Sequence, residues 1–152
     1  MKLTETPDIK NFPKTHYIFM EKVGPFQETA QQAWQECHKY KESIAKQVQI
    51  TGAFALYKIR PQMIYRAGFA VSGKPETLPP GFQYEEFQGG KYARFVLTGS
   101  YSQLPEACGK VFSIVEKTNL PMRDGFFGEN YVNDPNTTPE DQLQTEILIP
   151  TI

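Results

Sequence analysis

The sequence predicts an α+β fold built from two β-α-β-β repeats, with pseudo-twofold symmetry, an antiparallel sheet, two helices and a central groove. The main observation is a duplication: residues 17–26 match residues 92–101 without a gap, at a spacing of 75 positions from 17 to 92. Each copy passes from a strand pattern through a glycine turn into a helical pattern, and then into two further strand patterns. We therefore expect repeats at about 14–72 and 82–152. Residues at which the two copies differ are candidates for a functional role rather than a packing role.

The first repeat follows a polar N-terminal stretch. Residues 1–13 are interrupted by proline, and we expect a frayed arm there. Alternation of polar and apolar residues predicts a strand at 16–20, and apolar residues spaced by three to four predict a helix over 29–48. Two further strands are expected at 52–59 and 63–71, which would place the helix against one face of a sheet.

A proline-rich stretch at 72–80 indicates a linker, and we expect the seam between the repeats there. Residues 82–87 and 91–97 then flank Gly89-Gly90. Two glycines between strand patterns are a strong local signal for a tight turn, because both positions can adopt positive φ. The sequence therefore predicts a hairpin at the start of the second repeat.

The rest of the second repeat is predicted as a helix and two strands. The helix covers 104–117, with Ser102 as its expected N-cap. Strands follow at 125–132 and 143–149, separated by a polar loop rich in turn residues.

Composition limits the possible functions. A chain of 152 residues is long enough for one domain, 1–152, with a stable core. The formal charge of −1 and the lack of a basic stripe argue against direct binding to nucleic acid. Two unclustered cysteines and no long apolar run indicate a reduced, cytoplasmic protein outside the membrane. The two histidines show no metal-ligand spacing, so we expect neither a metal nor another cofactor.

Two carboxylates distinguish the second repeat from the first. Glu129 and Glu146 stand where the first repeat has Ala55 and Gly68. Because successive side chains of a strand point to opposite faces, Glu129 shares its face with two aromatic residues, Phe127 and Tyr131. If the last two strands are neighbours, both acids are expected to approach one cavity.

Burying an ionised carboxylate among aromatic rings costs about several kcal/mol of free energy. This cost is avoided if the carboxylate is protonated, and it is offset if an internal partner or a ligand compensates the charge. The partner could be a tyrosine hydroxyl or an arginine, and Glu146 in particular could pair with Arg66 or Arg94. The ligand would be a lipophilic cation, held by Coulomb attraction and cation–π contacts. The residues predicted to form this site are Glu129, Tyr131, Glu146, Tyr92, Trp34, Tyr57, Phe127 and Tyr101.

The same residues resemble a known family. Residues 125–135 followed by 143–150 are similar to the C-terminal signature of the GyrI-like (gyrase-inhibitor-like) small-molecule-binding domain, and 89–101 resembles its middle hairpin and following turn. This domain is also the effector-binding module of several AraC-type and MerR-type transcription activators. The resemblance spans residues 14–152 and implies that Glu129 neutralises cationic ligands, with Tyr131 and Glu146 beside it. Many relatives have Tyr where this chain has Leu148.

Three functions remain open on this basis. We favour a stand-alone, non-enzymatic module that senses or sequesters a hydrophobic, cationic drug or effector, with a possible link to transcription regulation. The resemblance also implies a hydrolase of small electrophiles such as cyclopropane-containing compounds, with Glu129 as general base and Tyr131 as its partner. The family name suggests a third function, inhibition of DNA gyrase through direct protein contact. The sequence does not specify the ligand or the oligomeric state.

Overall fold

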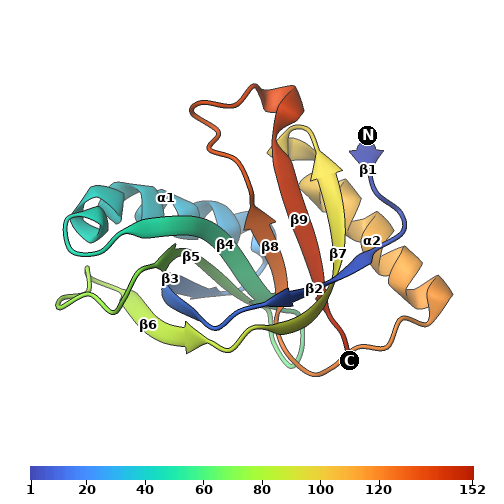
Figure 1. Ribbon diagram of the computed structural model, residues 1–152, viewed down its shortest axis with the longest axis horizontal. Coiled ribbons are helices and arrows are strands. Elements are labelled where there is room, and N and C mark those ends of the chain that lie inside the picture. Colours follow the sequence, from blue (N-terminus) through green and yellow to red (C-terminus); the bar gives the residue numbers. More distant parts are fainter. The chain divides into compact units, whose positions relative to one another are not determined.

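The computed structural model describes residues 1–152 and divides into two compact units. Unit 1 contains residues 1–12 and 90–152, and unit 2 contains residues 13–89. Each unit consists of an antiparallel sheet and one long helix (Figure 1). No helix is long and apolar enough to cross a membrane.

Unit 2 has four strands in the spatial order β4-β5-β3-β6 and the helix α1. The elements are β3 (Thr15–Val23), α1 (Phe26–Ala45), β4 (Ile50–Lys58), β5 (Ile64–Val71) and β6 (Phe82–Phe87). Helix α1 buries Ala33, Cys37 and Ile44 against the sheet.

Gly68 of β5 is packed closely against residues of the neighbouring strand β3. A Cβ atom at this position would lie 2.3 Å from the carbonyl oxygen of Ile18 and 2.7 Å from the ring of Tyr17. The Tyr17 hydroxyl in turn donates a hydrogen bond of 2.8 Å to the carbonyl of Phe54, so the ring cannot easily move away. Only glycine fits here.

Unit 1 repeats this order. Its elements are β1 (Lys2–Leu3), β2 (Asp8–Phe12), β7 (Gly90–Thr98), α2 (Leu104–Thr118), β8 (Phe127–Tyr131) and β9 (Gln144–Pro150). The strands lie in the order β8-β9-β7, and β1 and β2 pair with the other edge of β7. The core between α2 and the sheet consists of Ala93, Phe95, Leu97, Ala107, Val111, Val115, Ile147 and Ile149.

The predicted α+β class and the repeated β-α-β-β order are confirmed. Strands β3-β4-β5 and β7-β8-β9 have the same neighbours within their units, and each unit carries its helix after the first of these strands. The second helix is found at 104–118, within one residue of its predicted end. The central groove stays a prediction.

The N-terminal arm differs from the prediction. Residues 1–13 were expected to fray, yet β2 pairs with β7 from Asp8 opposite Arg94 to Phe12 opposite Gly90 (Figure 1). An unpaired strand edge is a template for another strand, and this pairing satisfies the backbone groups along that edge of β7. The polar sequence of the arm did not indicate this pairing because the partner strand lies far away in the sequence, 86 positions from 8 to 94.

The predicted hairpin at Gly89-Gly90 is wrong. Both edges of β7 are occupied, one by β1 and β2 and the other by β9. Strand β6 pairs with β3 instead, from Thr15 opposite Phe87 to Met20 opposite Phe82. The two glycines do adopt positive φ, of 72° and 111°, but they carry the chain from unit 2 into unit 1. The two compact units therefore divide at 89–90, and residues 72–80 lie within unit 2. The repeat boundary at 72–80 stays a prediction.

The turn before α2 also differs in detail. Ser102 does not cap the helix; the side chain of Ser100 accepts a hydrogen bond from the Ser102 backbone N–H and opens a 3-10 turn over Tyr101–Gln103. This turn leads directly into α2, whose N-cap residue, Gln103, makes no side-chain capping bond.

Candidate functional site

Strand β8 and helix α2 together position Glu129. In the pairing of β8 with β9, Glu129 lies opposite Ile147, and Ile147 belongs to the core beneath α2. Residues opposite each other in an antiparallel pair share a face of the sheet, so Glu129 points to the side covered by α2. Its side chain is half-buried.

Each oxygen of the Glu129 carboxylate accepts one hydrogen bond. The Tyr131 hydroxyl donates to Oε1 at 2.9 Å, and the Cys108 thiol donates to Oε2 at 3.3 Å. The salt bridges within unit 1 join Lys10 to Glu146 and Arg94 to Asp8 and Glu146. None of these ion pairs includes Glu129.

The surroundings of Glu129 disfavour its charge. Desolvation raises the pKa of this carboxyl, and the hydrogen bonds from Tyr131 and Cys108 offset part of that effect. A carboxylate whose charge is inadequately compensated by its own protein is a recognised mark of a functional site. It gains more from an added positive charge than a solvated acid does.

Tyr131 and Phe127 flank Glu129 on the same face of β8, and each of them packs against a further ring. The ring of Tyr131 meets the ring of Tyr101 edge-on, with centroids 5.4 Å apart. Phe127 lies two residues before Glu129 on the same strand face and meets Phe112 of α2 edge-on at 5.0 Å. The structure thus brings together Glu129, Tyr131, Tyr101 and Phe127 from the predicted set.

Cys108 and Phe112 of α2 complete this group and do not belong to the predicted set. Both are partly buried and pack against the core between α2 and the sheet. Helical spacing would have placed Cys108 toward the sheet, but not opposite one particular residue of β8.

Glu146 lies on the opposite face of the sheet. It is 3% exposed and accepts hydrogen bonds from Asn130 at 2.8 Å, Arg94 at 2.6 Å and Lys10 at 3.1 and 3.3 Å. Desolvation alone would raise the pKa of Glu146, but the bonds from Asn130, Arg94 and Lys10 outweigh it and lower the pKa. The expectation that Glu129 and Glu146 approach one cavity is wrong, because the register places Glu146 opposite Asn130.

Of the two predicted arginine partners of Glu146, Arg94 is confirmed. Arg66 instead bonds to Glu21 at 2.8 Å and Glu85 at 2.7 Å within unit 2. The pairing also corrects the equivalence between the repeats. Leu56 lies opposite Arg66 just as Asn130 lies opposite Glu146, so the counterpart of Glu146 is Arg66 and not Gly68.

Tyr92 lies on the same face of unit 1 as Glu146. Its ring meets Phe12 edge-on at 5.6 Å, and the Arg123 guanidinium lies 4.8 Å from the ring centroid. Desolvation raises the pKa of Tyr92, and Arg123 opposes this shift. Tyr92 is therefore apart from the group around Glu129.

Trp34 and Tyr57 belong to an aromatic cluster of unit 2. The Trp34 indole N–H donates to the Tyr65 hydroxyl at 2.8 Å. Phe26 packs against both tyrosines, with ring centroids 5.4 Å from Tyr57 and 5.9 Å from Tyr65. This cluster contains no carboxylate, since Ala55 takes the position that corresponds to Glu129.

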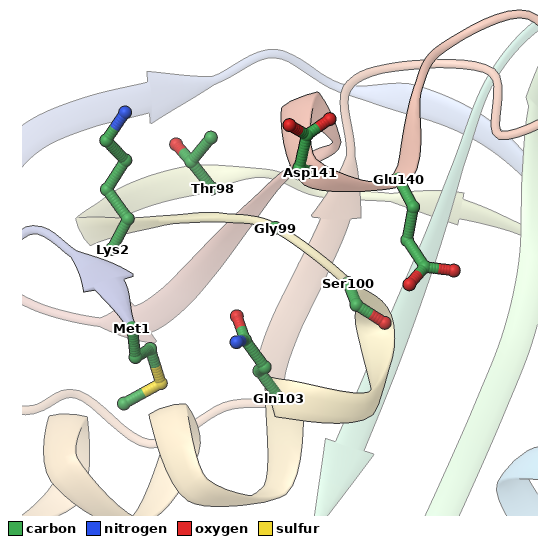
Figure 2. A pocket seen from close by; sticks show the side chains of 8 residues that line it. All are labelled: Met1, Lys2, Thr98, Gly99, Ser100, Gln103, Glu140 and Asp141. Carbon is green, nitrogen blue, oxygen red and sulfur yellow. The ribbon is translucent and has the colours of Figure 1, made fainter.

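A separate depression of ≈ 580 Å³ lies in unit 1 at the end of β7. Figure 2 shows its lining: Met1, Lys2, Thr98, Gly99, Ser100, Gln103, Glu140 and Asp141. None of the predicted ligand-binding residues lines it. No group of three or more His, Cys, Asp or Glu side chains is arranged to hold a metal ion.

The two β-α-β-β units define an α+β domain, and unit 1 carries a half-buried acid beside aromatic rings. The chain belongs to the family of the GyrI-like small molecule binding domain, whose profile matches residues 5–151. The resemblance drawn from the sequence is thereby confirmed.

Three relatives illustrate this membership. The SPbeta prophage-derived protein YosT of Bacillus subtilis (strain 168), a candidate transcriptional regulator, is 25% identical over 162 residues that cover 99% of each chain. The C-terminal domain of EcmrR superposes with a TM-score of 0.77 at 14% identity, covering 99% of this chain and 98% of that domain. SAV2435 bound to tetraphenylphosphonium superposes with a TM-score of 0.75 at 14% identity, covering 96% and 93%.

The structural likenesses concern the fold. In the structure of the EcmrR–DNA complex, this chain spans 58% of the EcmrR chain. The rest of the EcmrR chain has no counterpart in these 152 residues, so the activity of the whole EcmrR protein does not transfer to this chain.

Proposed function

We propose that this protein binds a hydrophobic, cationic small molecule at Glu129 and that binding serves effector sensing or sequestration linked to transcription. The observation that carries the proposal is the Glu129 carboxylate: it is half-buried, lacks an ion pair within its unit and accepts a hydrogen bond from Tyr131, whose ring packs against Tyr101. The candidate transcriptional regulator YosT supports the link to regulation, and the tetraphenylphosphonium complex of SAV2435 supports the class of ligand.

Charge supplies much of the expected affinity. Two unit charges 4 Å apart attract by about 4 kcal/mol at an effective dielectric constant of about 20. Contact between the cation and a tyrosine face adds about 0.5–2 kcal/mol. A lipophilic cation spreads its charge over apolar groups, so it loses less hydration on entering than a compact ammonium ion.

Tyr131 has two roles in this proposal. Its hydroxyl holds Oε1 of Glu129 at 2.9 Å, which fixes the carboxylate before a ligand arrives. Its ring, edge-on to Tyr101, supplies apolar surface beside the charge. Preorganisation of this kind lowers the entropic cost of binding.

Calorimetry with tetraphenylphosphonium tests the proposal. Glu129→Gln keeps the shape of the side chain and removes its charge, and we expect the affinity to fall by about ten- to a hundred-fold, or about 1.4–2.8 kcal/mol. Glu116→Gln is the matched control, because Glu116 is an exposed acid on α2 and its loss changes the net charge equally. Equal affinity of wild type and Glu129→Gln would contradict the proposal.

The pH dependence gives a second test. Protonation of Glu129 cancels the counter-charge, so affinity for the cation should fall as the pH decreases through the raised pKa of this carboxyl. The Glu129→Gln variant should show no such decline.

A hydrolase is the second candidate. The raised pKa of Glu129 makes it a stronger base than an ordinary carboxylate, and the Tyr131 hydroxyl is a proton donor next to it. Product formation from a cyclopropane-containing electrophile, absent in Glu129→Gln, would favour this function over simple binding.

A further inference from the structure

The two cysteines of the chain have different surroundings. Cys37 on α1 is 0% exposed, its thiol donates to the carbonyl of Ala67 at 3.2 Å, and burial raises its pKa to about 12. Cys108 on α2 is half-buried, and its thiol donates to Oε2 of Glu129 at 3.3 Å. A backbone carbonyl cannot take up a proton at neutral pH, whereas a carboxylate can.

We propose that Cys108 forms a covalent bond with soft electrophiles, such as α,β-unsaturated carbonyl compounds, that are held at the Glu129 site. The inference rests on the proposed function, because the same carboxylate recruits the ligand when the electrophile carries a positive charge. It assigns separate tasks to the two carboxylate oxygens: Oε1 is held by Tyr131, and Oε2 faces the thiol.

The reaction needs no additional reagent. The Cys108 S–H proton passes to Oε2 of Glu129 while a sulfur electron pair forms a bond to the β-carbon of the electrophile. The π electrons of the C=C bond move to the carbonyl as an enolate. The protonated Glu129 then returns the proton to the α-carbon. The net change is addition of the thiol across the double bond, and Glu129 is again ionised.

The neighbouring carboxylate also limits the reaction to bound ligands. A negative charge beside a thiol disfavours the thiolate, so Cys108 should react slowly with electrophiles that merely collide with it. Desolvation raises the pKa of Glu129, which makes it a better acceptor for the thiol proton once a ligand is in place. Holding the electrophile against the sulfur then supplies the effective concentration that drives the addition.

Labelling with two maleimides tests the inference on the full chain. One probe is N-ethylmaleimide, which is neutral, and the other is a maleimide that carries a trimethylammonium group. Peptide mass spectrometry measures the adduct at each cysteine, and Cys37 serves as the internal control. We expect saturable labelling of Cys108, at least about ten-fold faster with the cationic probe after correction for each probe's rate with glutathione, and slower labelling in the presence of tetraphenylphosphonium.

Substitutions at Glu129 distinguish its role as proton acceptor for the Cys108 thiol from its role as counter-charge for the cation. Glu129→Gln removes both, and the labelling rate should fall by about 100-fold or more. Glu129→Asp keeps the charge but shortens the side chain, so it should retain cation binding while the labelling rate falls. Glu116→Gln should label like the wild type, and circular dichroism confirms that each variant is folded.

The outcomes distinguish this inference from the proposed function. In one outcome, tetraphenylphosphonium binds in calorimetry, but the maleimides react with Cys108 no faster than with glutathione and the labelling rate does not saturate with probe concentration. The covalent step is then overturned and the binding function stands. If tetraphenylphosphonium does not bind, yet N-ethylmaleimide labels Cys108 with saturation and in a Glu129-dependent manner, the cation-binding function is overturned and the covalent step stands.

Discussion

Glu146→Gln should destabilise the fold, because it removes the negative charge at the centre of an ionic cluster. The carboxylate of Glu146 accepts from Arg94 at 2.6 Å and from Lys10 at 3.1 Å, and a glutamine can still accept from Asn130. Two charge-assisted hydrogen bonds are worth about 1.5–3 kcal/mol each. The side chains of Arg94 and Lys10 are 31% and 39% exposed, so solvent screens part of this energy. Arg94 also keeps Asp8.

We therefore expect a loss of about 2 kcal/mol at pH 7, or about 4–8 °C in melting temperature. Urea unfolding followed by far-ultraviolet circular dichroism measures it, with Glu116→Gln as the exposed control. The folded-state pKa of Glu146 lies below its ordinary value of 4.5, so its stabilising effect is present above pH 4.5 and is lost as the pH falls through the folded pKa. A variant within about 0.5 kcal/mol of wild type at pH 7, or a difference that persists in strong acid, would refute this reasoning.

Three other substitutions should change the stability of the fold in a stated direction. Glu129→Gln should stabilise the protein at pH 7, because the raised pKa of Glu129 means that folding favours its neutral form; thermal melts should converge as the pH falls below the folded pKa. Gly68→Ala should cost about 3 kcal/mol in urea unfolding, since the added Cβ would lie 2.3 Å from the Ile18 carbonyl oxygen. Gly109→Ala in α2 meets nothing within 4 Å and should stabilise by about 0.5–1 kcal/mol, and a cost here would show that the contact argument is unsound.

Local patterns predicted the elements, but not all of their partners. The helix over 104–118 was predictable because its apolar stripe is complete within the segment. The pairing of β2 with β7 was not, because five polar and apolar residues at 8–12 gain their strand structure only from the distant edge that they cover. Gly89-Gly90 shows the opposite failure: the glycines have the expected conformation, yet tertiary pairing takes β6 elsewhere.

The candidate site shows the same limit. Alternation along one strand correctly placed Glu129 with Phe127 and Tyr131, because side-chain direction is fixed within a strand. It could not tell whether Glu146 shares that face, because this depends on the register between β8 and β9, and a shift by one residue reverses the answer. The Cys108–Glu129 contact joins a helix to a strand and has no signature in either segment alone.

The division of the chain also has a consequence for synthesis on the ribosome. Residues 1–12 leave the ribosome before unit 2, but their partner strand β7 begins only at Gly90, after the whole of unit 2 has been made. Unit 2 is continuous and can mature as soon as residue 89 has left the exit tunnel, while the leading segment waits without a partner. Slow translation through 90–98 should therefore prolong the interval in which a nascent-chain binder or protease can reach residues 1–12.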